Sequence, residues 1–116
     1  MRLAVFALAA LAPALCLATP YDGLYRPNYD VAAAWDCERI GVDGGALAIE
    51  DDKLMGVETT CTLSDPVEVR DMDGVLYDAS CSSEGEAYGQ RIMLLAHEFG
   101  VYVIRDGVVL DWLRCE

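Results

Sequence analysis

Basic side chains are scarce in this sequence. The 116-residue chain has 8 Lys and Arg residues against 20 Asp and Glu residues, and Lys53 is its single lysine. Such a charge balance repels phosphate backbones and anionic lipid surfaces, so we expect neither a nucleic-acid partner nor a membrane partner for the mature chain. The negative charge serves solubility or attracts a cationic partner, and a basic protein or an envelope component is the class expected.

Metal-binding patterns are also missing. The cysteines include no Cys-x-x-Cys pair, and a lone histidine, His97, cannot complete a zinc site. Asp71-x-Asp73-Gly74 is similar to part of a calcium loop, but the first and twelfth loop positions would then be Val69 and Ser80, which carry no carboxylate. The segment is typical of a turn, and we expect no metal and no cofactor.

No catalytic motif stands out. The chain lacks the Gly-x-Ser-x-Gly elbow of serine hydrolases, and we expect His97 to lie in a solvated turn over 97–100. Pairs of carboxylates can always be found among 20 acids, so a pair alone does not indicate glycoside hydrolysis. We therefore expect no enzyme. A hydrolase with a carboxylate-based site is kept as an alternative, because a cleft that perturbs a carboxyl pKa cannot be seen in a sequence.

The first 18 residues have the anatomy of a secretory signal. Arg2 precedes an apolar run over 3–17 that contains Pro13, and Cys16-Leu17-Ala18 places small side chains at the positions that a signal peptidase reads. A membrane span needs about 20 apolar residues, and this run is shorter. We expect a Sec-type signal peptide over 1–18 and a protein that is exported from the cytoplasm.

Cleavage after Ala18 leaves one domain over 19–116. Removal of Arg2 makes the net charge −13, from 7 basic and 20 acidic side chains. Two alternatives exist: cleavage after Ala14, which would retain Cys16, and lipidation of Cys16, which the bulky Leu15 before it disfavours.

Four cysteines remain in the mature chain. An even number in an exported protein indicates two disulfides. Cys61 and Cys81 lie on segments that can be neighbouring strands, whereas Cys37 opens the β region and Cys115 ends it. We expect the nested pairs Cys61–Cys81 and Cys37–Cys115. The main alternative pairs Cys37 with Cys61 and Cys81 with Cys115.

Two tryptophans flank cysteines at similar offsets. Trp35 precedes Cys37 and Trp112 precedes Cys115. Aromatic rings packed on a disulfide are a common core device, so we expect both rings in the core, with a platform for a ligand as the alternative.

Period-two alternation of apolar residues dominates the chain from Gly41 onward. Strands are expected at 46–50, 53–63, 67–69, 75–82, 87–96, 101–105 and 108–115. Asp106-Gly107 is a strong hairpin signal. Turn signals every 8–12 residues predict an all-β fold, a small antiparallel β-barrel or sandwich of about seven strands stapled by two disulfides.

Three segments do not follow this alternation. Residues 19–28 carry two prolines and a glycine and are expected to form an irregular lead-in. Asp30 is expected to cap a single helical turn over 31–35. The apolar run 92–96 is either a strand buried on both faces or a helix, because five residues are too few to decide.

The segment Ser82 to Tyr88 is the main candidate for binding. It resembles the Ser-Gly-x-Gly-x-x-Tyr loop of the periplasmic and membrane-bound C-type lysozyme inhibitors, which are small exported β-barrels with one cysteine early and one at the C-terminal end. Ser82, Gly85 and Tyr88 keep the spacing, while Glu84 and Ala87 differ from the family's serine and arginine. The resemblance implies that the loop, with Ser82 as the inhibitory serine, enters the cleft of a lysozyme.

A second resemblance covers more of the chain. The order of motifs is similar to that in small exported proteins of unknown function from alphaproteobacteria: Trp35-x-Cys37, Ala46-Leu47-x-Ile49, Gly56-Val57-Glu58-x-x-Cys61, Cys81-x-x-Glu84-Gly85-Glu86 and Arg114-Cys115. This resemblance implies a bacterial protein that is periplasmic or secreted, and it indicates no particular activity. The leading hypothesis is thus a non-catalytic binding module, with lysozyme inhibition through 82–88 as the first alternative.

Overall fold

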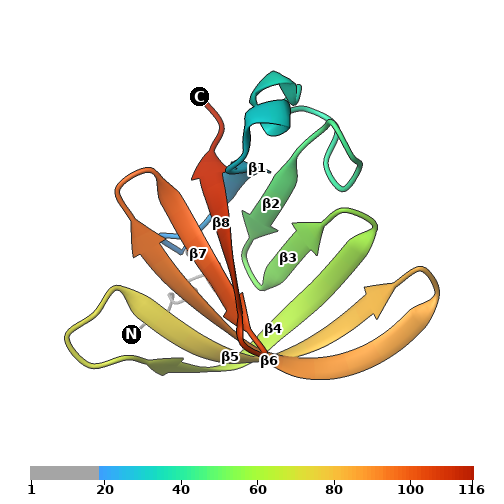
Figure 1. Cartoon of the computed structure of the whole chain (residues 1–116). Helices are drawn as coiled ribbons and strands as arrows, with labels where there is room; N and C mark the ends of the chain where they lie inside the picture. Colours follow the sequence, from blue (N-terminus) through green and yellow to red (C-terminus); the bar gives the residue numbers. More distant parts are fainter. Residues whose placement is uncertain (1–18) are drawn as a thin grey trace, which may run out of the picture.

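A computed structural model describes residues 19–116; the expected signal peptide, 1–18, lies outside the described residues. Eight strands form a closed antiparallel barrel in which each strand pairs with the next and β8 pairs with β1 (Figure 1). The strands are β1 Gly23–Pro27, β2 Leu47–Glu50, β3 Lys53–Gly56, β4 Thr59–Glu68, β5 Gly74–Ser83, β6 Glu86–His97, β7 Gly100–Arg105 and β8 Val108–Arg114. The all-β class is confirmed, and of the two expected architectures the barrel is the correct one.

Alternation along the strands places one set of side chains inside the barrel. Ile92 and Leu94 of β6 are fully buried, and Val101 and Val103 of β7 are nearly so. Because successive side chains of a strand point to opposite faces, these residues line the interior and their neighbours face outward. The run 92–96 is therefore part of a strand and not a helix.

The expected single strand over 53–63 is wrong. The chain reverses at Val57-Glu58, between β3 and β4, and Glu58 adopts a left-handed φ of 53°. Neither residue is the Asn, Asp or Gly that marks a two-residue hairpin turn, so the sequence carried no clear signal. The expected short strand at 67–69 is instead the end of β4, after an irregularity between Ser64 and Val67. These changes, with β1, give eight strands where about seven were expected.

The expected irregular lead-in over 19–28 is also wrong in part, because it contains β1. Tyr25 at the centre of β1 is fully buried, and β1 pairs with both β2 and β8. The strand thus closes the barrel. The following turn is a 3₁₀ helix, η1 Asp30–Ala34, in which Asp30 is the first residue and Tyr29, with no side-chain hydrogen bond, is the cap.

A cluster of tyrosines fills one end of the barrel. The Tyr25 hydroxyl donates a hydrogen bond to the Tyr21 carbonyl, and the Tyr21 hydroxyl lies 3.2 Å from the carbonyl of Asp73 in the β4–β5 turn. The Arg114 guanidinium lies 5.1 Å from the centre of the Tyr25 ring. Burial raises the pKa of both tyrosines above the ordinary value of 10.0. These contacts join the segment before β1 to the β4–β5 turn at this end of the barrel.

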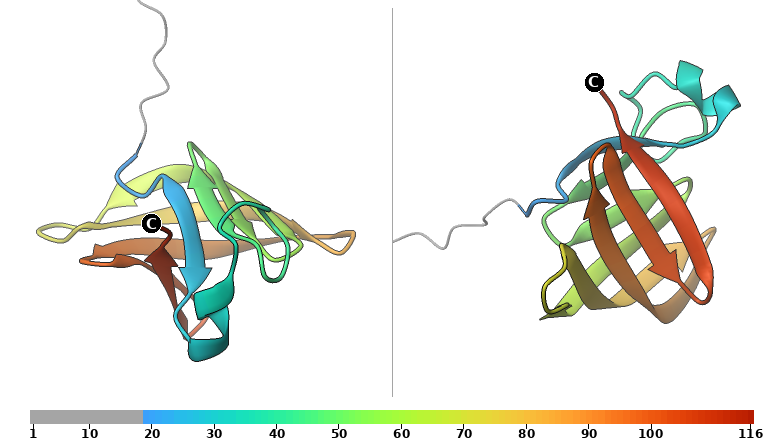
Figure 2. Two further views of the ribbon diagram at one scale, coloured as in Figure 1. Left: turned by 90° about the horizontal axis from the view of Figure 1, so that it is seen from above. Right: turned by 60° about the vertical axis from the view of Figure 1, so that its left-hand side comes forward.

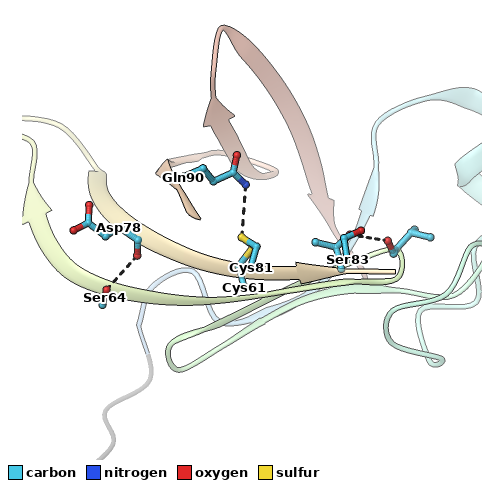
Figure 3. Close-up of a disulfide and its surroundings, with 8 residues drawn as sticks. Cys61, Ser64, Asp78, Cys81, Ser83 and Gln90 are labelled. Carbon is cyan, nitrogen blue, oxygen red and sulfur yellow. Dashed lines mark hydrogen bonds between the residues drawn. A yellow bond between two sulfur atoms is a disulfide. The ribbon is translucent and has the colours of Figure 1, made fainter. Parts of the chain in front are cut away.

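Both expected disulfides are confirmed. Cys61–Cys81 joins directly opposed residues of β4 and β5, and Gln90 lies over it (Figure 3). Cys37–Cys115 joins the segment after η1 to the residue after β8, and Figure 2 shows η1 and the C-terminus on the same side of the barrel. The disulfides indicate an oxidising, extracytoplasmic compartment. Within residues 19–116, no helix has the length and apolar character needed to cross a membrane.

Candidate functional site

The end of the barrel opposite the tyrosine cluster holds a cavity of about 500 Å³. The residues around it come from the ends of β1, β3 and β7 and from the starts of β2, β4 and β8. Because the strands are antiparallel, all of these ends meet at one rim of the barrel. Buried apolar residues line the inner part: Leu47, Leu54, Cys61, Val103 and Trp112.

Exposed apolar side chains surround the mouth of the cavity. Tyr29 is 59% exposed, Val57 40% and Val109 60%, and all three line the cavity. Single exposed apolar residues are common, but a set of them around a hollow is typical of a binding site. Trp35, just after η1, adds a partly buried indole to the same wall.

The segment that carries Trp35 is fixed by local bonds. Cys37 ties it to Cys115, and the Asp36 carboxylate accepts hydrogen bonds from the backbone amides of Glu38 and Arg39. The Arg39 side chain, which bonds the same carboxylate, is the main cause that lowers the pKa of Asp36 to about 2. Asp36 therefore stays charged at physiological pH, and these contacts hold the wall of the cavity in place.

A polar cluster lies at the edge of the cavity, built on Asp111 of β8. One carboxylate oxygen of Asp111 is 2.8 Å from His97 Nε2, and the other accepts a hydrogen bond of 2.9 Å from the Asn28 side chain. The Phe99 amide donates to His97 Nδ1 at 3.2 Å. Since Nδ1 accepts this bond, Nε2 carries the proton of the neutral ring and donates it to Asp111.

The sequence predicted a solvated turn for His97, and this prediction is wrong. His97 ends β6, its side chain is only 18% exposed, and its ring packs on Tyr102 with ring centres 4.4 Å apart. The expected turn over 97–100 is shorter than predicted. His97 pairs with Gly100 as the last residue pair between β6 and β7, so the turn itself consists of residues 98 and 99. The hydrogen-bond partners of His97 are a carboxylate and a backbone amide, and neither is the hydroxyl or thiol that a histidine base activates in a serine or cysteine hydrolase. The cluster thus orders the edge of the cavity.

The described part of the chain has no group of three or more His, Cys, Asp or Glu side chains that could hold a metal ion.

The binding residues expected from sequence lie on the β5–β6 hairpin, outside the cavity. Glu84 and Gly85 form its two-residue turn, with φ angles of 50° and 85°. Tyr88 is opposite Cys81 and so shares the face of the buried disulfide, whereas Ser82 is opposite Ala87 on the other face. The four expected binding residues are all exposed: Ser82, Glu84, Gly85 and Tyr88. The side chains of Ser82 and Tyr88 nevertheless lie on opposite faces of the hairpin and do not form one site.

Sequence reasoning did not find the cavity. Its walls come from segments far apart in the sequence, within 27–35, 43–61 and 103–112, and the first and last of these meet because β1 pairs with β8. The one sequence feature that pointed to the cavity was the pair Trp35 and Trp112. Both rings were expected in the core, and a platform for a ligand was the alternative. Both line the cavity, and Trp112 is buried. No protein-family model, curated protein or solved structure matches this chain.

Proposed function

We propose that this protein is a non-catalytic binding protein of the bacterial periplasm that holds a small apolar ligand in the open end of its barrel. The observation that carries the proposal is the cavity of about 500 Å³ with its apolar inner wall. Small-molecule sites have volumes of about 300–1,000 Å³ and are lined mainly by apolar and aromatic side chains. The interior of an eight-stranded barrel is either filled by side chains or just wide enough for one small ligand, and the cavity here is of the second kind.

The hydrophobic effect supplies the driving force for binding. Transfer of apolar surface from water into the cavity is favourable by about 25 cal/mol per Å². The inner wall offers Leu47, Leu54 and the Trp112 ring, while the mouth adds Tyr29 and Val109. Because tyrosines fill the other end, a ligand would enter and leave by the mouth alone.

The cellular setting of the proposal rests on three features. The disulfides need an oxidising compartment. The sequence over 1–18 has the composition of a secretory signal. A net charge of −13 after cleavage keeps a small protein soluble even though apolar side chains are exposed at its cavity mouth.

The proposal is tested with a neutral fluorescent probe, N-phenyl-1-naphthylamine, whose emission rises in apolar surroundings. The exported form with both disulfides should bind it saturably. Val109→Asp, which places a charge at the mouth, should weaken binding about tenfold, because the carboxylate must lose water when the probe enters. Val67→Asp is the matched control, since Val67 is 59% exposed on β4 and lies outside the cavity, whereas Val109 is 60% exposed.

Equal loss of binding in both variants would show that the probe adheres to the general surface, and absence of saturable binding to the parent protein would refute the proposal. Circular dichroism and thermal unfolding of all three proteins exclude misfolding as the cause.

Lysozyme inhibition is the second candidate. It is favoured by the exposed β5–β6 hairpin, which projects from the barrel (Figure 1), and by the acidic charge, which attracts basic lysozymes. It ranks lower because Ser82 and Tyr88 face opposite sides of that hairpin. Excess protein added at low salt to chicken-type, goose-type and invertebrate-type lysozymes should slow cell-wall lysis in at least one case. Normal lysis by all three would remove this candidate.

If inhibition is found, Tyr88→Ala should make the free energy of binding to the lysozyme less favourable by about 2 kcal/mol, the size of an interface hot spot. The distant change Asp106→Asn should alter mainly the association rate. The hydrolase alternative gains no support from Asp36, because its pKa is lowered to about 2 and a general acid needs the opposite shift.

A further inference from the structure

Among residues 19–116, Arg105 is the one cationic residue that lines the cavity. It ends β7, two residues after the buried Val103, so it lies on the inner face of that strand at the mouth. The residue is partly buried. A guanidinium in this place is close to the water–cavity boundary, where a polar group of a bound molecule would lie.

The other cations of the described chain have different surroundings. Arg39, Lys53 and Arg91 are paired with carboxylates, and Arg114 donates to the carbonyls of Pro20 and Asp22. Within residues 19–116, Arg105 has no carboxylate within 4.0 Å, although the chain holds 20 acidic side chains. Arg26 and Arg70 share this property but lie outside the cavity.

Two carboxylates also line the cavity, and neither offsets Arg105 directly. Both oxygens of Asp111 are engaged, one with His97 and the other with Asn28. Asp43 is exposed to solvent, where water and salt screen its charge. The mouth therefore presents an unpaired guanidinium beside an apolar interior.

We propose that the ligand of this cavity is an anionic amphiphile, a molecule with an apolar chain and a single carboxylate or similar anionic group. This inference rests on the proposed function. The chain lies against Leu47, Leu54 and Trp112, and the anionic group binds Arg105. A guanidinium suits this task because its fixed fork of N–H donors can bind both oxygens of a carboxylate.

Long-range repulsion does not prevent such binding. The net charge of −13 after cleavage opposes an approaching anion, but exposed charges farther away than about 8 Å are largely screened at physiological ionic strength. At the mouth, contact with Arg105 outweighs the screened field. The apolar chain contributes equally for a neutral, anionic or cationic head group, so the head group alone decides the preference.

Three compounds of twelve carbons each separate the contributions: dodecanoate, dodecanol and dodecylammonium. Dodecanoate has one apolar carbon fewer than the other two, which works against the preference expected for it. Each competes with bound N-phenyl-1-naphthylamine at about pH 8, where the carboxylate and the ammonium are charged. Dodecanoate should bind about tenfold more tightly than dodecanol, equivalent to about 1.4 kcal/mol, and dodecylammonium should bind most weakly.

Variants of the arginine then assign the preference. Arg105→Gln should lower the affinity for dodecanoate about tenfold and should change the affinity for dodecanol less than about twofold. Arg105→Lys, which keeps the charge but loses the fork, should retain part of the preference. Arg70→Gln, a cation removed outside the cavity, is the control and should leave all three affinities unchanged.

The two proposals fail in different ways. If all three compounds bind equally, or Arg105→Gln has no effect on dodecanoate, the anionic ligand class is wrong while the cavity remains a binding site. Tightest binding of dodecylammonium would overturn the class as well. If neither the probe nor any compound binds, both proposals are wrong.

Discussion

Cys61 and Cys81 lie directly opposite each other on β4 and β5, with Cα atoms 4.0 Å apart, and both residues are buried. Cys61 also lines the cavity. The second disulfide differs, because Cys37 and Cys115 are both partly exposed. One bond is therefore part of the core, and the other fastens the segment that carries Trp35 to the end of the chain.

This difference in burial predicts the order of reduction. A mild thiol under native conditions should reduce Cys37–Cys115 first, because thiol–disulfide exchange requires access to a sulfur atom. Cys61–Cys81 should react only when the barrel opens. Timed alkylation followed by peptide mass analysis identifies the order, and earlier modification of Cys61 or Cys81 would contradict this assignment of burial.

Three buried or partly buried tyrosines predict loss of stability at high pH. Burial is the main cause that raises the pKa of Tyr21, Tyr25 and Tyr77 above 10.0 in the folded protein. Their neutral forms favour folding, so this stability is complete below about pH 10 and is lost as the pH rises through the raised values. Urea midpoints between about pH 8 and pH 12 should fall only above about pH 10.

Phenolate absorbance gives an independent check on the same groups. Tyr21, Tyr25 and Tyr77 should titrate above the ordinary tyrosine pKa of 10.0 while the protein remains folded. Titration of these three side chains at the ordinary value in folded protein would show that burial does not exclude water from them.

Two glycines in strands give a matched test of packing. A Cβ added at Gly100 would lie 1.9 Å from the Trp112 carbonyl oxygen, whereas one added at Gly89 would lie 3.7 Å from the Ala79 oxygen, an ordinary contact. Gly100→Ala should lower the free energy of unfolding by about 3 kcal/mol, as expected for overpacking against backbone. Gly89→Ala should change it by less than about 0.5 kcal/mol.

Chemical denaturation compares the two glycine variants. Similar unfolding midpoints for both would mean that β7 does not approach β8 as closely as the barrel requires.

The later strands could be predicted because local signals agreed there. Residues around Val101 and Val103 alternate cleanly, and Asp106-Gly107 marks the β7–β8 turn, where both residues have positive φ angles. Both disulfides could be predicted from the order of strands. The turn at Val57-Glu58 could not, because it has no residue that prefers a left-handed conformation as strongly as glycine does.

The candidate site could not be predicted for a different reason. Tyr29 and Trp112 are 83 positions apart in the sequence, and only the pairing of β1 with β8 places them around one cavity. Local patterns predict strands, but they do not predict which strand closes a barrel. A short exposed hairpin such as 82–88 attracts attention in a sequence because its serine and glycine residues lie within four consecutive positions.

The two tryptophans allow the most direct measurement of ligand binding. The chain has only Trp35 and Trp112, and both line the cavity, so their indole N–H signals can be followed in a correlation spectrum of isotopically labelled protein. Titration with dodecanoate should shift both indole signals saturably and leave the backbone amide of Ser82, on the outer side of the β5–β6 hairpin, unchanged. Unshifted indole signals, or shifts confined to residues 82–88, would contradict a ligand site in the barrel.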